Sequence, residues 1–397
     1  MDKKPEKLVP EVRFKGFTDD WEQRKLGEIS KRVRNNDGRM NLPLLTISAR
    51  YGWMTQQSRF SASIAGREKK NYTLLEKHQL SYNHGNSKVA IYGTVYELTN
   101  YDEALVPKVY HSFSLTPENS SKFIESYFHT KKLDAQLRKF IASTARMDGL
   151  LNISFDDFMK VKLFAPEQCE QSKISRIINL IEKLITLQQR KLEILIKLKR
   201  SFLTKSMANS LDKNPELYFN SASVKWLKQK LSDLTIKEFK GNTKLNDTKP
   251  GKTEYLDAER LNGNVPLFID KPINTLKSDI LILWDGSKAG SVYYGFEGSL
   301  GSTLKAIRLN PKMVNSFFVY QQLKSKQDVI FNKYRTPNIP HVIKNFTKVY
   351  PIYFPSMAVQ NKIARFLGNL DTLIEIQQKS IKDHKVIKKY LLQKLFI

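Results

Sequence analysis

The stretch whose residue types come nearest to a catalytic motif is Pro250-Gly251-Lys252-Thr253, because a glycine followed by lysine and threonine ends many phosphate-binding loops. The first glycine of such a loop would stand five residues before Gly251, where the chain has Asn246. No apolar strand precedes the stretch. We therefore do not expect a nucleotide-binding loop here.

Carboxylates and histidines give no better catalytic site. Asp233, Glu238 and Lys240 have the residue types of a nuclease metal site, but this spacing is common in charged sequence. The chain has no Asp/Asn-Pro-Pro-Tyr/Phe motif for base methylation, its six histidines lack metal-ligand spacing, and its one cysteine, Cys169, can form no internal disulfide. We expect no metal and no catalytic residue on this chain. The alternative is a stand-alone nuclease or methyltransferase with an unrecognised active site.

The charge balance indicates a polyanionic partner. The 397 residues include 66 Lys and Arg against 39 Asp and Glu, which leaves a net charge of +27, far more than solubility requires. A hydrophobic content of 41% is enough for two or three globular domains. No run of about 18 apolar residues could span a membrane, and no signal-peptide pattern follows Met1. We therefore expect a cytoplasmic protein that binds nucleic acid and not membrane.

The most informative feature is an internal repeat. Residues 164–205 align with residues 353–394 without a gap, at a constant offset of 189, and 12 of the 42 positions are identical. Upstream, the segment from Trp21 to Leu26 is answered by the segment from Trp226 to Leu231 at an offset of 205. The sequence therefore predicts a tandem duplication.

Each copy begins with its tryptophan, continues through a variable segment and ends in Phe/Tyr-x-Pro before a long helical segment. Short apolar runs between turn residues predict strands at 44–48, 89–92 and 280–284, and helices are expected near 121–141 and 311–326. We expect an N-terminal arm at 1–20, a first recognition domain at 21–166, a helix and linker at 167–215, a second recognition domain at 216–355 and a second helix at 356–397.

The two helical segments have apolar residues at a 3-4 spacing and no interior proline, which predicts coiled-coil helices of roughly 60 Å. Gln188 and Gln377 occupy the same repeat position on this apolar seam. We predict that the helices pair antiparallel and that these glutamines meet in one layer and fix the register, although a tolerated polar position is the alternative. The expected fold class is α+β, with two α/β target recognition domains in tandem repeat, separated by two long antiparallel coiled-coil helices with pseudo-twofold symmetry.

This duplicated order resembles the specificity subunit of type I restriction-modification enzymes over essentially the whole chain. The resemblance rests on three sets of residues: Pro10-Glu-Val-Arg-Phe14-Lys-Gly-Phe17 before Trp21, Asp279-Ile-Leu-Ile with Asp285-Gly286-Ser287 and Gly290, and the helix starts in which Pro166 and Pro355 precede Gln171 and Gln360 by five residues. No single motif is diagnostic, but the duplicated order is.

The resemblance implies a non-catalytic subunit for phage defence. It implies that the two variable domains bind double-stranded DNA, and that the helices bind two adenine methyltransferase subunits, which restriction subunits with translocase and nuclease activity join. S-adenosylmethionine, ATP and Mg²⁺ would then belong to those partners. The DNA target should be bipartite and asymmetric, because the two domains differ in sequence. A highly acidic DNA-mimicking inhibitor should compete with DNA.

Residues that could read DNA are basic or amide side chains interleaved with aromatic residues in polar loops. In the first domain these are Arg50, Tyr51, Gln56, Gln57, Arg59, Arg67, Lys69, Lys70, Asn83, Asn86, Lys88 and Arg146. In the second domain they are Lys240, Asn242, Lys244, Lys252, Ser287, Lys288, Lys333, Arg335 and Thr336. We expect Trp53 and Trp284 to be core residues. A structural coiled-coil protein and an RNA-binding protein are the remaining alternatives, and the two large, divergent domains argue against the first.

Overall fold

The computed structural model describes residues 8–60, 66–85, 87–142, 150–207, 226–336 and 340–397. The predicted Asn86 and Arg146 lie outside these residues. The chain divides into two compact units: the first contains Met1–Gln188 and Ser380–Ile397, and the second contains Gln189–Lys379. Each long helix therefore contributes one part to each unit. No helix among the described residues is long and apolar enough to cross a membrane.

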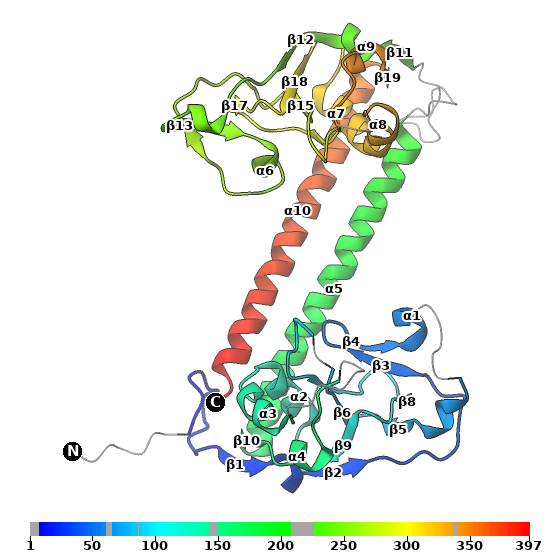
Figure 1. Cartoon of the computed structure of the whole chain (residues 1–397), viewed down its shortest axis with the longest axis vertical. Helices are drawn as coiled ribbons and strands as arrows, with labels where there is room; N and C mark the ends of the chain where they lie inside the picture. The colour runs from blue at the N-terminus through cyan, green and yellow to red at the C-terminus, as the bar shows by residue number, and fades with distance from the viewer. Residues whose placement is uncertain (1–7, 61–65, 86, 143–149, 208–225, 337–339) are drawn as a thin grey trace, which may run out of the picture. The chain divides into compact units, whose positions relative to one another are not determined.

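The first unit is an α+β domain built around a four-stranded antiparallel sheet of order β2-β9-β6-β7 (Figure 1). Its strands are β1 (Glu22–Lys25), β2 (Ser30–Val33), β3 (Leu45–Ser48), β4 (Gly52–Thr55), β5 (Thr73–Glu76), β6 (Leu80–Asn83), β7 (Thr94–Glu97), β8 (Glu103–Val106), β9 (His111–Leu115) and β10 (Lys162–Ala165). Its helices are α1 (Gln56–Phe60), α2 (Ser121–His129), α3 (Asp134–Phe140), α4 (Phe155–Met159) and the first part of α5 (Gln168–Ser206), with 3-10 turns η1 (Leu26–Glu28) and η2 (Gly66–Asn71).

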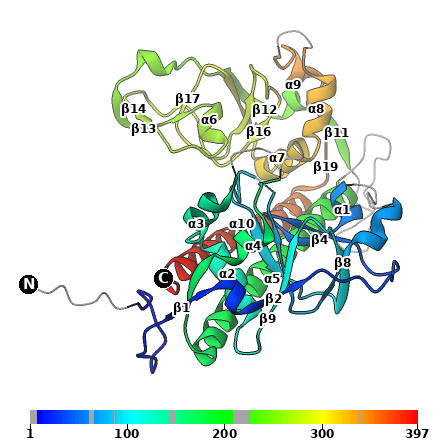
Figure 2. The same ribbon diagram turned by 60° about the horizontal axis from the view of Figure 1, so that its bottom comes forward.

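The second unit repeats this plan with the sheet order β12-β18-β15-β16 (Figure 2). Its strands are β11 (Leu227–Lys230), β12 (Thr235–Lys240), β13 (Pro250–Leu256), β14 (Phe268–Ile269), β15 (Ile280–Leu283), β16 (Val292–Tyr293), β17 (Ser299–Leu300), β18 (Leu304–Leu309) and β19 (Pro351–Phe354). Its helices are α6 (Ala258–Leu261), α7 (Ser316–Ser325), α8 (Gln327–Lys333), α9 (Phe346–Val349) and the first part of α10 (Met357–Lys394), with 3-10 turns η3 (Leu231–Leu234) and η4 (Leu245–Asp247). The tandem α+β duplication is therefore confirmed.

The repeat identified in the sequence corresponds to the same pairing of first and last strands in both domains. The strand after each opening tryptophan pairs antiparallel with the strand that precedes the long helix, so β1 pairs with β10 and β11 pairs with β19. Trp21 and Trp226 are buried, and each packs against an aromatic residue of the following helix, Phe123 in α2 and Phe318 in α7. The first and last parts of each globular domain are thereby closed on each other.

A glutamine joins each long helix to its own globular domain. Gln171 donates from Nε2 to the carbonyl oxygen of Pro166 at 2.9 Å and accepts from the backbone N–H of Ser120 at 3.0 Å. Gln360 makes the same two bonds, to Pro355 at 2.9 Å and from Asn315 at 2.8 Å. Ser120 and Asn315 in turn cap α2 and α7 with their side chains. This amide therefore connects the helix start, the preceding proline and the neighbouring cap in both units.

The helices run antiparallel within each unit. In the first unit Glu182 of α5 pairs with Lys388 of α10 at 2.8 Å. In the second unit Lys199 of α5 pairs with Asp371 of α10, and Phe202 packs against Phe366 with ring centroids 4.4 Å apart. The two ion pairs are repeat-related, because each partner lies at the offset of 189 from its counterpart. The predicted antiparallel pairing is therefore confirmed inside each unit.

The predicted contact between Gln188 and Gln377 would join one unit to the other, and it stays a prediction. Gln377 is buried and Gln188 is half-buried.

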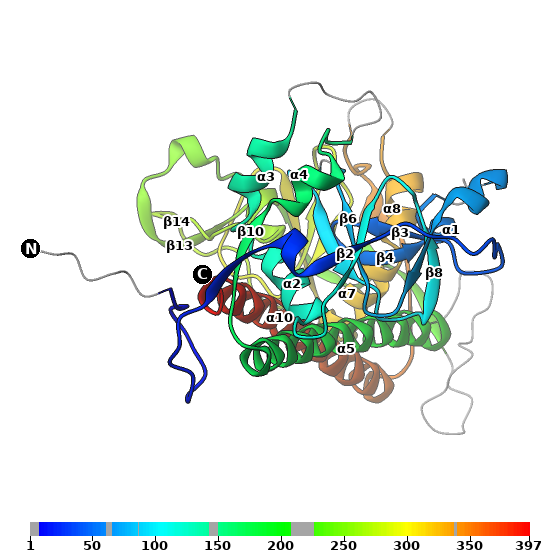
Figure 3. The ribbon, with the colours of Figure 1, turned by 90° about the horizontal axis from the view of Figure 1, so that it is seen from below.

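The end of α10 completes the hydrophobic core of the first unit. Leu392, Leu395 and Phe396 share one buried cluster with Trp21 and Ile178. In all three whole-chain views the C-terminus lies beside the segment that leads into β1 (Figure 3), where the N–H of Val12 donates to the carbonyl oxygen of Lys394 at 2.9 Å. The first domain is therefore assembled from residues at both ends of the chain.

Two of the predicted elements are wrong. Residues 89–92 form a turn instead of a strand, because Ser87 and Ala90 bond each other through their backbones and Gly93 follows with a φ of 82°. The helix expected over 121–141 is two helices, α2 and α3, which are separated where Lys131 adopts a φ of 66°. The strands at 44–48 and 280–284 and the helix at 311–326 correspond to β3, β15 and α7.

Replacing Phe396 with Ala should destabilise the first unit by about 3–5 kcal/mol, because the ring is 1% exposed and packs against Trp21, Phe123 and Tyr127. Tyr390→Ala is the matched control, since Tyr390 is 51% exposed on the same helix and its loss should cost about 0.5 kcal/mol or less. Hydrogen exchange checks the prediction: the Phe396→Ala variant should lose protection in α2 and β6. Equal protection in the two variants would contradict it.

Candidate nucleic-acid interface

The best-defined candidate surface surrounds the turn that follows β15 in the second unit. Gly286 has a φ of 106°, a conformation that favours glycine, and a Cβ there would meet no atom within 4 Å. The backbone N–H of Gly286 donates to the carbonyl oxygen of Pro340 at 2.9 Å, and Asp285 forms a backbone bridge with His341. The turn is therefore held on the loop that precedes α9, while Ser287 and Lys288 remain exposed at its tip.

Several predicted DNA-reading residues come together at this turn. Arg335 donates from Nη1 to the carbonyl oxygen of Ser287 at 3.1 Å, and Lys240 pairs with Asp285 at 2.6 Å. Thr336 contacts His341 through its hydroxyl group. The structure thus gathers residues from β12, from the turn and from the end of α8 into one polar, basic surface: Lys240, Ser287, Lys288, Lys333, Arg335 and Thr336.

The other second-domain candidates lie further along the chain from β12. Asn242 is exposed next to Thr243, which bridges to Gly301 and so lies near the start of β18. Lys244 precedes η4, and Lys252 is exposed on β13, which belongs to the separate sheet β14-β13-β17. No contact in the described residues joins Lys244 or Lys252 to the turn surface.

The first unit has a comparable surface around the turn after β6. The side chain of Asn83 donates from Nδ2 to the carbonyl oxygen of Ile47 at 3.0 Å and accepts from the N–H of Gly85 at 3.0 Å. Ile47 belongs to β3, and the loop after β3 presents Arg50 and Tyr51, whose ring is 70% exposed and lies 5.7 Å from the guanidinium of Arg50. Asn83 therefore orders the turn, while Arg50 and Tyr51 are presented to a ligand.

The remaining first-domain candidates divide into buried, engaged and exposed residues. Gln56 is 4% exposed and donates to the hydroxyl of Tyr72 at 3.0 Å, so the structure corrects its assignment: it packs in the interior. Arg59 donates to the carbonyl oxygen of Ile47 at 2.5 Å and supports β3. Gln57, Lys70 and Lys88 are exposed and Lys69 is half-buried, whereas the structure describes only the backbone of Arg67, in η2.

A buried histidine stack beneath the first surface was missed by the sequence analysis. His84 and His111 stack with ring centroids 5.0 Å apart, next to Tyr82 and Phe158. The Nδ1 and Nε2 atoms of His84 lie 2.7 Å from the carbonyl oxygens of Leu151 and Val109. The stack therefore holds the turn after β6 against the segments that contain Val109 and Leu151. Only the proximity of His84 to the glycine turn could have indicated it from sequence.

Of the two tryptophans expected in the core, Trp284 is confirmed as a core residue and Trp53 packs at the edge of a core cluster. Trp284 is buried beneath the turn surface, with the ammonium of Lys305 4.1 Å from its ring centroid. Trp53 is half-buried and donates from Nε1 to the carbonyl oxygen of Glu97 at 3.0 Å. Neither ring is presented for base stacking.

One cluster in the first unit has metal-ligand residue types. Glu125, His129 and Glu182 could offer three ligand atoms within 4.8 Å of one another. The ammonium group of Lys122 already lies 3.0 Å from Glu125 and 2.5 Å from Glu182, and Lys388 also pairs with Glu182. Because two ammonium groups neutralise the two carboxylates, the arrangement is a buried ion-pair network that joins α2, α5 and α10.

Burial controls protonation in this network. It raises the pKa of Glu125 to about 7. It lowers the pKa of His129 from 6.5 to about 3, and the nearby charges of Lys388 and Lys122 act in the same direction. The Nε2 atom of His129 lies 3.0 Å from the carbonyl oxygen of Val95, and this bond acts in the opposite direction, because it raises the pKa of His129.

Comparison with known proteins places this geometry in a family. Residues 223–383 match the family described as type I restriction modification DNA specificity domain. The type I restriction enzyme MjaVIII specificity subunit of Methanocaldococcus jannaschii is 32% identical over 165 residues, which cover 41% of this chain and 39% of that protein. A protein of the same organism named as a type I restriction enzyme MjaX specificity subunit is 24% identical over 419 residues, with coverage of 95% and 93%.

The fold comparison covers nearly the whole chain. The crystal structure of the S subunit of a type I restriction-modification system from M. genitalium superposes with a TM-score of 0.68 at 16% identity, and covers 98% of this chain and 99% of that one. The chain thus has two tandem α+β recognition domains, each completed by antiparallel helices. In the family match and in these relatives the chain is similar to type I restriction-modification specificity subunits, in agreement with the resemblance seen in the sequence.

The buried network predicts a pH dependence that His129→Gln should reduce. In the unfolded chain His129 takes up a proton below about pH 6.5, whereas the folded ring stays neutral down to about 3, so the free energy of unfolding falls as pH is lowered through this window. Glu125 acts in the opposite direction because its folded-state pKa is raised. Glu125 is present in both the wild type and the His129→Gln variant, so the difference between the two proteins reports on His129 alone.

The measurement is the urea midpoint for loss of amide protection in α2, at about pH 7.5 and about pH 5. Acidification should lower the midpoint more in the wild type than in His129→Gln. Equal losses would show that His129 does not carry this dependence.

Proposed function

We propose that this chain selects the DNA sequence of a type I restriction-modification complex by binding an asymmetric, bipartite target through its two recognition domains. The proposal rests chiefly on the repetition of one fold in both units, with a basic turn surface in each. The two surfaces carry different side chains, so the two half-targets should differ in sequence.

Each surface offers groups suited to different parts of a duplex. In the second unit, the guanidinium of Arg335 and the ammonium groups of Lys288 and Lys333 can contact guanine edges or phosphates. In the first unit, Arg50 and Tyr51 are exposed on the loop after β3, which the side chain of Asn83 joins to the turn after β6. The net charge of +27 favours duplex DNA at long range, and a highly acidic DNA mimic would exploit the same surfaces.

We further propose that the long helices scaffold partner subunits. Large apolar side chains are exposed along both helices, which supports docking of other proteins. They include Leu180, Leu187, Ile194, Leu373, Ile376 and Val386. Two methyltransferase subunits are the expected partners, and restriction subunits would join through them.

The chemistry would belong to those partners. S-adenosylmethionine would supply the methyl group in the methyltransferase subunits, and ATP and Mg²⁺ would be used by the restriction subunits. A stand-alone nuclease or methyltransferase is the less favoured reading, because the carboxylate-histidine cluster of the described residues is neutralised by lysines.

Lys288→Ala should weaken DNA binding while leaving assembly with the methyltransferase unchanged, because Lys288 is exposed at the tip of the turn surface. Loss of one phosphate contact should also reduce the slope of log affinity against log salt by about 0.9. Lys312→Ala is the matched control, since Lys312 is exposed in the same unit before α7. Fluorescence anisotropy across a salt series measures both quantities, and identical slopes for the two variants would contradict the assignment.

Arg50→Ala tests the first surface in the same way. It should weaken binding to a cognate duplex without affecting partner assembly, because the guanidinium lies over Tyr51 on an exposed loop. Lys139, exposed on α3, gives the matched control Lys139→Ala. Equal affinity of Arg50→Ala and wild type at moderate salt would remove Arg50 from the interface.

The function as a whole is tested by co-expression with a type I methyltransferase subunit, followed by mapping of methylated adenines in the host genome. The expected result is one asymmetric motif with two specified parts and an unspecified gap. Methylation at a single continuous motif would contradict the bipartite proposal, and methylation by this chain without the partner would support the stand-alone enzyme.

A further inference from the structure

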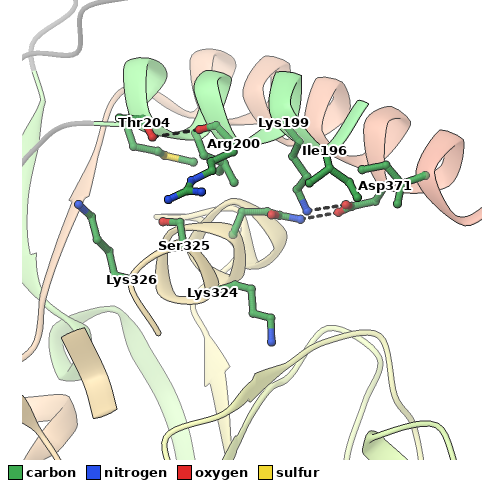
Figure 4. Close-up of a pocket in the computed structure, with 12 residues that line it drawn as sticks. Ile196, Lys199, Arg200, Thr204, Lys324, Ser325, Lys326 and Asp371 are labelled. Atoms are coloured by element: carbon green, nitrogen blue, oxygen red, sulfur yellow. Dashed lines mark hydrogen bonds and ion pairs between the residues drawn. The ribbon is translucent and has the colours of Figure 1, made fainter. Parts of the chain in front are cut away.

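A concave site of about 500 Å³ lies in the second unit, between the last turns of α5, the end of α7 and the first part of α10 (Figure 4). All of its lining residues belong to this unit. Its apolar wall consists of the lining residues Ile196, Leu203, Met207 and Ile374. The DNA-reading turn surface contributes no residue to it, so the function proposed above does not account for the site.

The polar side of the cavity carries an excess of positive charge. Lys199, Arg200, Lys324 and Lys326 line it together with a single carboxylate, Asp371. Asp371 is already engaged, because it pairs with Lys199 and accepts from Nε2 of Gln321 at 2.7 Å. Figure 4 shows these interactions on one side of the cavity, with Arg200 and Lys326 at another part of its lining.

Two of these cations have no counter-charge. The structure gives no side-chain hydrogen bond or ion pair between the described residues and either the guanidinium of Arg200 or the ammonium of Lys326. Lys324 donates to the carbonyl oxygen of Val292 at 3.2 Å and to Gln327 at 2.9 Å, neither of which is charged. Burial lowers the pKa of Lys324, and the positive charge of Lys199 lowers it further.

The floor of the cavity also holds an unsatisfied acceptor. Gln321 is 1% exposed, and its Oε1 atom has no hydrogen-bond partner. A buried amide oxygen without a donor is costly in a folded protein. The cavity therefore combines uncompensated cations, an apolar wall and an incompletely bonded amide.

The repeat-related place in the first unit carries a different set of charged side chains. The caps Ser120 and Asn315 align α2 with α7 at an offset of 195, so Glu125 corresponds to Tyr320. In the first unit, two carboxylates, Glu125 and Glu182, balance two lysines in the buried network. The second unit keeps the pair Asp371–Lys199, the counterparts of Glu182 and Lys388, and has Phe317 where the first unit has Lys122. The second carboxylate and its lysine are thus both absent from the second unit, whereas Lys324 stands at the position of His129 and adds a positive charge there.

We propose that this cavity binds a nucleoside phosphate, whose phosphate groups would pair with Arg200 and Lys326 and whose base would lie on the apolar wall. Arginine pairs with phosphate in a bidentate geometry, and a cavity of this volume is within the usual range for small ligands. Duplex DNA is too broad to enter a concave site of about 500 Å³. A bare anion would leave the apolar wall unused.

The test is calorimetric titration of the full-length chain, free of DNA, with ATP, tripolyphosphate and adenosine. ATP should bind more tightly than tripolyphosphate, and adenosine should bind weakly. The double variant Arg200→Gln with Lys326→Gln should lose affinity for ATP by at least about tenfold, or about 1.4 kcal/mol.

The first unit provides a matched control. Lys389 and Lys131 correspond by the offsets of 189 and 195 to Arg200 and Lys326, and both are exposed. Lys389→Gln with Lys131→Gln removes the same charge from the chain and should leave ATP binding unchanged. Both double variants should unfold at the wild-type urea midpoint, which shows that any loss of binding is not a loss of folding.

Three results would overturn the proposal. Absence of ATP binding to the wild type, or equal loss in the two double variants, would show that no specific site exists. Tripolyphosphate binding as tightly as ATP would show that no nucleoside is recognised. Displacement of ATP by an acidic peptide that binds more tightly, with the same dependence on Arg200 and Lys326, would assign the cavity to a protein partner.

Discussion

The amide of one glutamine in each copy is the contact on which the rest of the arrangement depends. Gln171 and Gln360 each accept from the backbone at the cap of the neighbouring helix and donate to the proline that precedes the long helix. Both side chains are buried, so loss of either would leave backbone groups without partners. Because the bonds fix where each long helix starts relative to its domain, they also determine which helical residues reach the core.

The two units share the position of one ion pair between the long helices but differ in the charged groups around it. The repeat-related ion pairs Glu182–Lys388 and Asp371–Lys199 both cross between the helices. In the first unit the pair is absorbed into a buried network with Lys122 and Glu125, whereas in the second it borders an open, basic cavity. Duplication thus preserved the connection between helices while the groups around it diverged.

The sequence was most informative where the two copies agree. The opening tryptophans, the prolines and the helical glutamines could be matched by constant offsets, and these residues form the closing strand pairs and the helix anchors. The DNA-reading candidates could be predicted less well, because polarity alone does not show whether a side chain is at the surface. Gln56 and Asn83 have the residue types of base readers. Gln56, however, is buried in the first domain, and the amide group of Asn83 hydrogen-bonds to backbone groups and orders a turn. Residue 131 was expected to lie within one helix, whereas its positive φ separates α2 from α3.

The use of the final residues as core has a consequence for the order of folding during synthesis. The second unit is complete once Lys379 has been made, whereas the first unit lacks Leu392, Leu395 and Phe396 until residue 396 has been made. The domain that leaves the ribosome first is therefore the last that can close its core, and its contacts span almost the full length of the chain. Such long-range closure is slow and exposes apolar surface in the interval. A nascent chain of this protein would thus need protection at its first domain until these core residues of α10 have left the ribosome.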